Sequence, residues 1–492
     1  MPPKPTWRSS LRRRWMMRLA AILLAVSPLL VLELALRWVS PVPAFAVDFD
    51  PWVDLHQLRP LFVLDESQHR WRIGAERMNF FQPASFAAEK PPGALRLFVL
   101  GGSTVQGRPY APPTAFSKWL QLRLQAADAD REIEVVNCGG VSYASYRVAK
   151  ILDEVLQHQP DAIVLYTGHN EFLEDREYAE VRQFGATDRW ISQLAAKFHT
   201  VRWIQSRWLV DNEASEGLAS VMPGEVDTRL DHAGGLDKYQ RDDVWRSGVE
   251  AHFAETLKRM VQRCRQAEVP LVLCLPACDL VQTPPFKTTM KAGLSGEQQQ
   301  RFQSAWSIAD HADQSIAERL QACREALDID PEHAGANYLA GKILFSRGET
   351  ESAARLLTAA RDFDVCPLRA TTPIVEAVTG EAHSAEILFV DTVALLDRRD
   401  HESRRIPDGI ADPSLFVDHV HPSIPGHQAI AGEIAIALSR YGWFPSQTNP
   451  RVEARYQELA SKHLESLGED YFARGQQRLE GLKKWASGRV RD

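Results

Sequence analysis

The stretch at residues 95–104 reads LRLFVLGGST, an apolar run of strand length that ends in two glycines and a serine. Residues 114–127 then have helical spacing, so this region predicts a strand, a tight turn and a helix. In open α/β folds such a turn lies at the carboxyl end of a sheet strand, where ligands bind. Ser103 is therefore a candidate nucleophile, and it requires a base, an orienting acid and oxyanion donors from elsewhere in the chain.

Strand and helix patterns alternate downstream of this stretch. Apolar runs of strand length occur at residues 95–100, 133–136, 162–166, 269–275 and 387–390. Helical spacing occurs at residues 114–127, at 148–155 ahead of Pro160, and at about 244–266. Strands that alternate with helices predict an α/β fold whose parallel sheet is covered by helices on both faces.

The chain divides into six expected segments. These are a basic start and membrane anchor at 1–40, an irregular lead-in at 41–94, the main α/β domain at 95–290, a helical insertion at 291–370, the last strand of the main domain with an Asp/His block at 371–445, and a C-terminal helix at 446–492. The lead-in is expected to be irregular because it is rich in proline, aromatic and charged residues without a sustained period.

The insertion is predicted because the gap between the last two strands is far too long for one loop. Its packing residues follow the spacing of a tetratricopeptide repeat at Asn337, Ala340, Gly341, Leu344, Gly348, Ala353, Leu357 and Ala360. A single repeat cannot stack alone, so two alternatives remain: a helical hairpin packed on the main domain, or a surface that binds a protein partner. We expect the insertion to lie outside the sheet and its deletion to leave a folded core.

The amino-acid composition and net charge limit the classes of molecule that the protein is expected to bind. The 492 residues are 45% hydrophobic and 25% charged, which is ordinary globular composition. A formal net charge of −7 would repel phosphate backbones, so we expect no nucleic-acid partner. The six cysteines are too scattered for a disulfide scaffold, and Cys274 and Cys278 lack a matching pair of zinc ligands. We expect the cysteines to be core thiols or, at most, to form one disulfide bridge. We expect no metal and no cofactor.

The N-terminus has the residue pattern of a membrane-inserted segment. Five arginines between residues 8 and 18 precede an apolar run at 19–36. This order predicts a single-pass transmembrane helix with a cytoplasmic N-terminus and an extracytoplasmic main domain. The small residues Ala44 and Ala46 also fit a cleavage site, in which case the protein would be secreted after cleavage behind Ala46.

An Asp and a His three residues apart follow the last strand. Asp418 and His421 stand at a loop-to-helix junction, where the carboxylate can hold the imidazole while the other ring nitrogen faces Ser103. His421 is therefore the expected base and Asp418 its orienter. His419 is the rival base, but its spacing from Asp418 is expected to point it away.

Candidate oxyanion donors follow two other strands. Asn170 comes after the strand at 162–166, and its side-chain amide can donate to a developing oxyanion. The strand at 133–136 runs into Asn137-Cys138-Gly139-Gly140-Val141-Ser142, where the backbone N–H of Gly140 or of Ser142 can donate. Arg108 and Tyr110, just past the nucleophile, are candidates for the substrate-binding rim.

These four pieces, in this order and each after a strand, resemble the four blocks of the SGNH (GDSL-type) hydrolases. The resemblance implies a three-layer, flavodoxin-like sheet, with Ser103 as nucleophile, Asp418 and His421 completing the triad, and Asn170 in the oxyanion hole. Two positions depart from the family pattern. Gly102 stands where the commonest motif has Asp, and Ser142 stands where the second block usually has Gly.

The resemblance further implies a serine esterase that cleaves an acyl ester, such as an acetyl ester, through an acyl-enzyme on Ser103. Its substrate would be an ester or an acylated glycan. Two alternatives remain open: an O-acyltransferase that acts on an extracytoplasmic polysaccharide, because the chemistry up to the acyl-enzyme is shared, and an inactive scaffold that binds partners through the insertion.

Overall fold

The computed structural model describes residues 15–18, 24, 27–28, 30–36, 50, 52–56, 58–176, 200, 220–384, 387–399, 405–443, 447 and 449–486. The chain forms two compact units, Met1–Asp54 with Glu180–Ser220, and Leu55–Ala179 with Val221–Asp492. Within the described residues, no helix is both long enough and apolar enough to cross a membrane. Part of the expected span at 19–36, and the cleavage site at Ala46, lie outside those residues.

A five-stranded parallel sheet forms the centre of the second unit, which confirms the predicted α/β class. Its strands are β5 (Leu95–Gly101), β6 (Ile133–Gly139), β7 (Ala162–Tyr166), β9 (Leu271–Cys274) and β10 (Leu388–Val390). The spatial order is β10-β9-β7-β5-β6, which is the flavodoxin-like order 2-1-3-4-5 when the strands are counted along the chain. β5 lies between two neighbours, which explains why its residues are almost all apolar and all buried.

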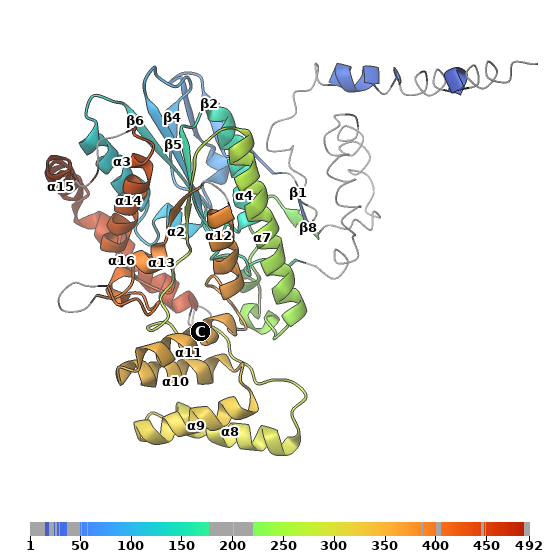
Figure 1. Ribbon diagram of the computed structural model, residues 1–492, viewed down its shortest axis with the longest axis vertical. Coiled ribbons are helices and arrows are strands. Elements are labelled where there is room, and N and C mark those ends of the chain that lie inside the picture. Colours follow the sequence, from blue (N-terminus) through green and yellow to red (C-terminus); the bar gives the residue numbers. More distant parts are fainter. Residues whose placement is uncertain are drawn as a thin grey trace, which may run out of the picture. The chain divides into compact units, whose positions relative to one another are not determined.

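Helices cover both faces of this sheet (Figure 1). The helices of one face are α3 (Phe116–Ala127) and α14 (Ile424–Ser439), and those of the other are α4 (Ser145–Val155), α7 (Asp243–Gln266) and α12 (Thr372–Ser384). Shorter helices are α2 (Ser103–Gln106), α13 (Thr392–Leu395), η2 (Ala75–Arg77), η3 (Pro112–Thr114), η4 (Leu156–His158), η6 (Arg229–Asp231), η7 (Gly235–Lys238) and η8 (Pro413–Leu415). The molecule is therefore three-layered at the sheet, as expected.

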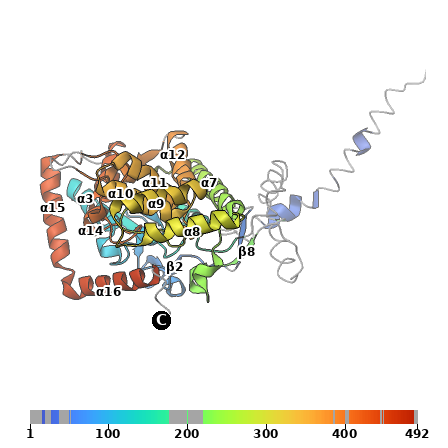
Figure 2. The same ribbon diagram turned by 90° about the horizontal axis from the view of Figure 1, so that it is seen from below.

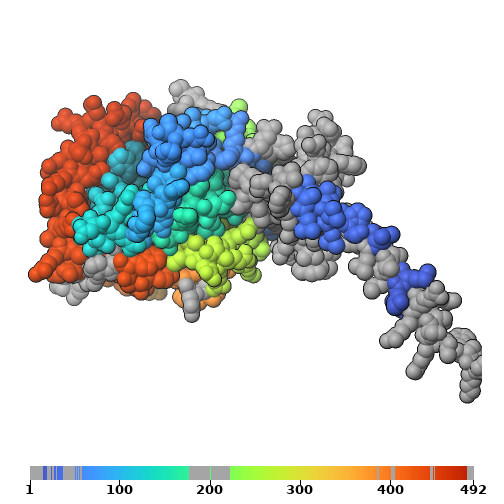
Figure 3. Space-filling view, turned by 90° about the horizontal axis from the view of Figure 1, so that it is seen from above, coloured from blue at the N-terminus to red at the C-terminus, as the bar shows by residue number. Residues whose placement is uncertain are grey.

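The lead-in is more ordered than predicted. It contains a three-stranded antiparallel sheet made of β2 (Phe62–Asp65), β3 (Arg70–Ile73) and β4 (Ser85–Ala87), and Figure 3 shows this segment in light blue on the surface. The Phe86 ring packs at 5.1 Å from that of Phe98 in β5. The expectation of an irregular segment was wrong because strands of three or four residues are too short to show a period. Two further strands, β1 (Val53–His56) and β8 (Ser220–Pro223), form a two-stranded sheet.

Four helices of the insertion lie outside the sheet, below it in Figure 1. They are α8 (Gly296–Asp310), α9 (Ile316–Ile329), α10 (Ala334–Ser346) and α11 (Thr350–Asp362). Their buried residues, such as Leu344 and Leu357, form one hydrophobic cluster with Ile410 and Val420 of the main domain. This shared cluster joins the insertion to the main domain, and it argues against the expectation that deletion of the insertion leaves a folded core. A protein partner for these helices stays a prediction.

The C-terminal segment forms two helices instead of the single helix expected. They are α15 (Pro450–Glu465) and α16 (Gly468–Ala486), which turn a corner beside α3 in Figure 2. The break occurs at Gly468, whose φ of +69° lies in the left-handed region that ends helices and favours glycine. α16 thereby reaches the loop that follows Ser103.

Candidate active site

The turn after β5 presents Ser103 at the carboxyl edge of the sheet. Gly101 pairs with Gly139 of β6 on one side and with Tyr166 of β7 on the other, so all three strands end at one level. A Cβ on Gly101 would lie only 2.0 Å from the carbonyl oxygen of Tyr166, which explains why glycine is needed there. Ser103 begins the short helix α2, and its side chain is nearly buried.

The structure brings together the three residues expected to form a triad. His421 Nε2 lies 2.8 Å from Ser103 Oγ, and His421 Nδ1 lies 2.7 Å from Asp418 Oδ2. The other oxygen of Asp418 accepts hydrogen bonds from the backbone N–H groups of Val420 and His421, at 3.0 and 2.9 Å. The carboxylate therefore orients both the ring and the loop that carries it.

Two opposing effects act on the pKa of Asp418. Burial favours the neutral acid, but the adjacent imidazoles of His421 and His419, with the hydrogen bonds from His421, hold the pKa well below its usual range. Asp418 is thus a carboxylate at neutral pH. A charged carboxylate beside Nδ1 fixes that nitrogen as the protonated one and leaves Nε2 free to accept a proton from Ser103.

His419 lies closer to Asp418 than its spacing suggested. Its Nδ1 is 3.6 Å from Asp418 Oδ1, but its ring packs edge-on at 4.9 Å against Phe286, and the described residues show no bond from it to Ser103. Burial lowers the pKa of His419 to about 3, so the ring is neutral. The geometry therefore favours His421 over His419 as the base.

Buried histidines around the site make the fold sensitive to acid. Burial lowers the pKa of His169 to about 4 and that of His427 to about 3, against about 6.5 in an unfolded chain. The unfolded state then binds more protons below pH ~6.5, so the free energy of unfolding should fall as the pH drops from ~6.5 to ~4. Urea titrations at several pH values measure how the free energy of unfolding changes with pH. His169→Gln should flatten this dependence, and a slope of opposite sign would contradict the assignment.

The oxyanion donors differ in part from those expected. Asn170 Nδ2 donates one hydrogen to the carbonyl oxygen of Tyr143 at 3.1 Å, which leaves its second hydrogen available. The N–H of Gly140 is already bonded to Gly101 O at 3.0 Å, so Gly140 is not the donor. The N–H groups of Ser103 and Ser142 have no hydrogen-bond partner among the described residues. Ser142 is therefore the better candidate in the second block.

Gly102 leaves room for Asn170. A Cβ at position 102 would lie 2.4 Å from Asn170 Nδ2, so with the present geometry any side chain there would require the amide to shift. Gly102→Ala should therefore lower kcat by about 10²–10³-fold, the effect of losing one oxyanion donor. Steady-state kinetics on a neutral ester measure this loss. Gly380→Ala is the matched control, because a Cβ there meets nothing within 4 Å, and equal rates for both variants would contradict the steric argument.

The predicted rim residues lie where the chain leaves the nucleophile turn. The N–H of Arg108 donates to Ser103 O at 3.2 Å, so Arg108 is fixed to the same turn. The ring of Tyr110 stacks against Tyr471 of α16, with centroids 6.4 Å apart. Sequence reasoning missed α16 as a neighbour of the site, and missed the carbonyl of Tyr143, because neither belongs to a motif.

Outside this site, the described residues include a cavity and six cysteines. A cavity of about 330 Å³ lies at the starts of α7 and α12, and most of its charged residues are already paired, as in the bond from Thr371 to Glu250 at 2.8 Å. No three His, Cys, Asp or Glu side chains in the described ranges lie close enough to hold a metal ion. All six cysteines are buried and unpaired, so the optional bridge does not form.

Comparison with known proteins adds little. No family model and no curated protein matches the chain. Among solved structures, the chain is similar to a lipolytic protein of the G-D-S-L family from Desulfitobacterium hafniense DCB-2, at 10% identity over 70% of this chain and 98% of that chain, with a TM-score of 0.29. It is also similar to an acetyl xylan esterase from Geobacillus stearothermophilus, at 14% identity over 71% and 94% of the two chains, with a TM-score of 0.29. Likenesses this low carry no functional inference.

Proposed function

We propose that this chain is a serine esterase of the SGNH type that forms an acyl-enzyme on Ser103. The observation that carries the proposal is the position of His421, whose two ring nitrogens lie 2.8 Å from Ser103 Oγ and 2.7 Å from Asp418 Oδ2. This arrangement stands at the carboxyl edge of a flavodoxin-like sheet, where such folds bind ligands.

The reaction follows from this geometry. Ser103 Oγ attacks the ester carbonyl while His421 Nε2 takes its proton, and the negative charge that develops on the carbonyl oxygen is stabilised by the N–H groups of Ser103 and Ser142 and by the amide of Asn170. Protonated His421 then gives its proton to the leaving alcohol. A water molecule, activated by the same ring, cleaves the acyl-enzyme and regenerates Ser103.

Labelling with a serine-directed fluorophosphonate tests the proposal. The folded protein should be labelled on Ser103, and it should hydrolyse 4-nitrophenyl acetate. The His421→Ala variant should lose both reactions, because Ser103 then has no base. A folded protein that is not labelled would overturn the proposal and favour a scaffold. Mass spectrometry of the products, with a sugar acceptor present, distinguishes hydrolysis from acyl transfer.

We also propose that the main domain is extracytoplasmic. The proposal rests on the arginines that precede the apolar run at 19–36, because positive charge on the near side of such a run keeps the N-terminus in the cytoplasm. Alkaline phosphatase fused after Val47 should then be active. Activity of only a cytoplasmic reporter at that position would contradict this location.

A further inference from the structure

Arg108 stands out among the arginines of the described chain. Arg96, Arg147 and Arg241, which are likewise buried or half-buried, each pair with an Asp or Glu at 2.6, 2.7 and 2.9 Å. Arg108 is half-buried, yet its guanidinium has no hydrogen bond or ion pair to any described residue. A partly desolvated charge without a counter-charge is unfavourable, so this position calls for an explanation beyond packing.

A second arginine contacts the loop that carries Arg108. Arg478 of α16 donates from Nη1 to the carbonyl oxygen of Tyr110 at 3.1 Å, and it is exposed and without an acidic partner among the described residues. α16 is held over this loop by close packing, because a Cβ at Gly475 would fall 2.0 Å from the Tyr110 ring. The helix also bonds the loop through Tyr471 and Thr114, whose hydroxyl oxygens are 2.8 Å apart.

The charges of Arg478 and Asp418 both act on the guanidinium of Arg108. Burial and the charge of Arg478 lower the pKa of Arg108, and the charge of Asp418 raises it. Asp418 cannot serve as the missing partner, since its oxygens are occupied by His421 and by backbone N–H groups. Two positive charges near the same loop repel each other, and an anion bound between them would relieve that repulsion.

We propose that Arg108 and Arg478 form a subsite for an anionic group of the substrate, so that the preferred esters carry a carboxylate or a similar charge near the scissile bond. This inference rests on the proposed esterase function and deepens it. Arginine suits the task because its planar donors match the two oxygens of a carboxylate. Arg108 is tied through its N–H to Ser103 O, so the anion would be fixed relative to the nucleophile.

Two pairs of esters test the subsite and show on which side of the bond the charge lies. One pair is 4-nitrophenyl acetate and 4-nitrophenyl hemisuccinate, which differ by a carboxylate on the acyl group. The other is an O-acetylated methyl hexoside and the matching O-acetylated methyl hexuronoside, which differ by a carboxylate on the alcohol. In at least one pair, kcat/KM should be about 10- to 100-fold higher for the anionic member, and the preference should weaken at high ionic strength.

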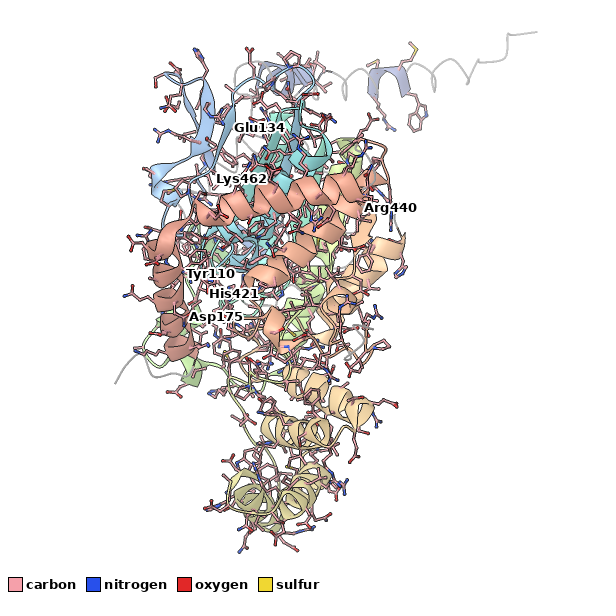
Figure 4. All side chains as sticks on the ribbon, turned by 90° about the vertical axis from the view of Figure 1, so that its left-hand side faces the viewer. Tyr110, Glu134, Asp175, His421, Arg440 and Lys462 are labelled. Atoms are coloured by element: carbon pink, nitrogen blue, oxygen red, sulfur yellow. The ribbon has the colours of Figure 1, made fainter. Side chains whose placement is uncertain are left out.

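Substitutions decide whether the arginines cause this preference. Arg108→Gln should remove most of it, chiefly through KM, Arg108→Lys should restore part of it, and Arg478→Gln should weaken it. The control is Arg440→Gln, an exposed arginine that Figure 4 shows well away from Tyr110 and His421, and it should keep the full preference. Equal rates within both pairs, or an equal loss for both members in Arg108→Gln, would overturn the inference. Failure to hydrolyse any of the four esters, with Ser103 unlabelled by fluorophosphonate, would instead overturn the esterase proposal and this inference with it.

Discussion

Ser103→Ala should lower the rate of ester hydrolysis by about 10⁶-fold, and His421→Ala should cost about as much. The two losses should be similar because the residues act as a unit: Ser103 is a poor nucleophile without the ring at 2.8 Å, and the later proton transfers by the ring all depend on the attack of Ser103. Single-turnover kinetics with a chromogenic ester, on protein shown to be folded by circular dichroism, measure both losses.

The double variant sharpens this prediction. Ser103→Ala combined with His421→Ala should be no slower than either single variant, since the second substitution removes nothing further. Asp418→Asn should cost less, about 10⁴-fold, because the ring stays in place but the negative charge that stabilises its protonated form is lost.

His419→Ala is the internal control for the choice of base. Its ring packs on Phe286 and makes no bond to Ser103 within the described residues, so this variant should retain most activity. If His419→Ala abolished activity and His421→Ala spared it, the assignment of the base would fail, and with it the resemblance of this block to the SGNH family.

The strands of the parallel sheet, and the candidate triad residues that the structure brings together at its edge, could be predicted from the sequence. Long apolar runs such as 95–101 are buried on both faces, so they stand out from their surroundings, and the run at 95–101 ends in glycine and serine, which mark the edge of the sheet. Asp418 and His421 are close in the sequence, so the hydrogen bond between their side chains could also be expected from the local sequence.

The features that could not be predicted depend on distant contacts. Gly140 looked like an oxyanion donor, but its N–H is taken by Gly101, a fact set by the register between β5 and β6. Arg478 meets Tyr110 across 368 residues of sequence, and no periodicity connects them. The antiparallel sheet of the lead-in was missed because its strands are too short to carry a pattern.

The contribution of the insertion to the stability of the triad loop could not be predicted from the sequence either. Its helices were expected from their spacing, but no pattern in the sequence indicates that they bury part of the loop that carries the triad. Val420 stands between His419 and His421 and is only 3% exposed, in a cluster with residues of α9, α10 and α11. Tyr338 adds a hydrogen bond of 2.7 Å from its hydroxyl to the carbonyl of Val281 in the neighbouring loop.

Replacing residues 291–362 by a short glycine and serine linker should therefore abolish activity, because Val420 and Ile410 would lose their apolar neighbours and the Asp418–His421 loop would lose its support. Ester hydrolysis and fluorophosphonate labelling measure the loss. A milder variant separates this effect from gross misfolding: Leu344→Ala should lower the free energy of unfolding by about 2–5 kcal/mol, whereas Ile308→Ala, on the exposed side of α8, should change it by less than about 0.5 kcal/mol. A deletion variant that is soluble and fully active would show that the Asp418–His421 loop keeps its active structure without the insertion.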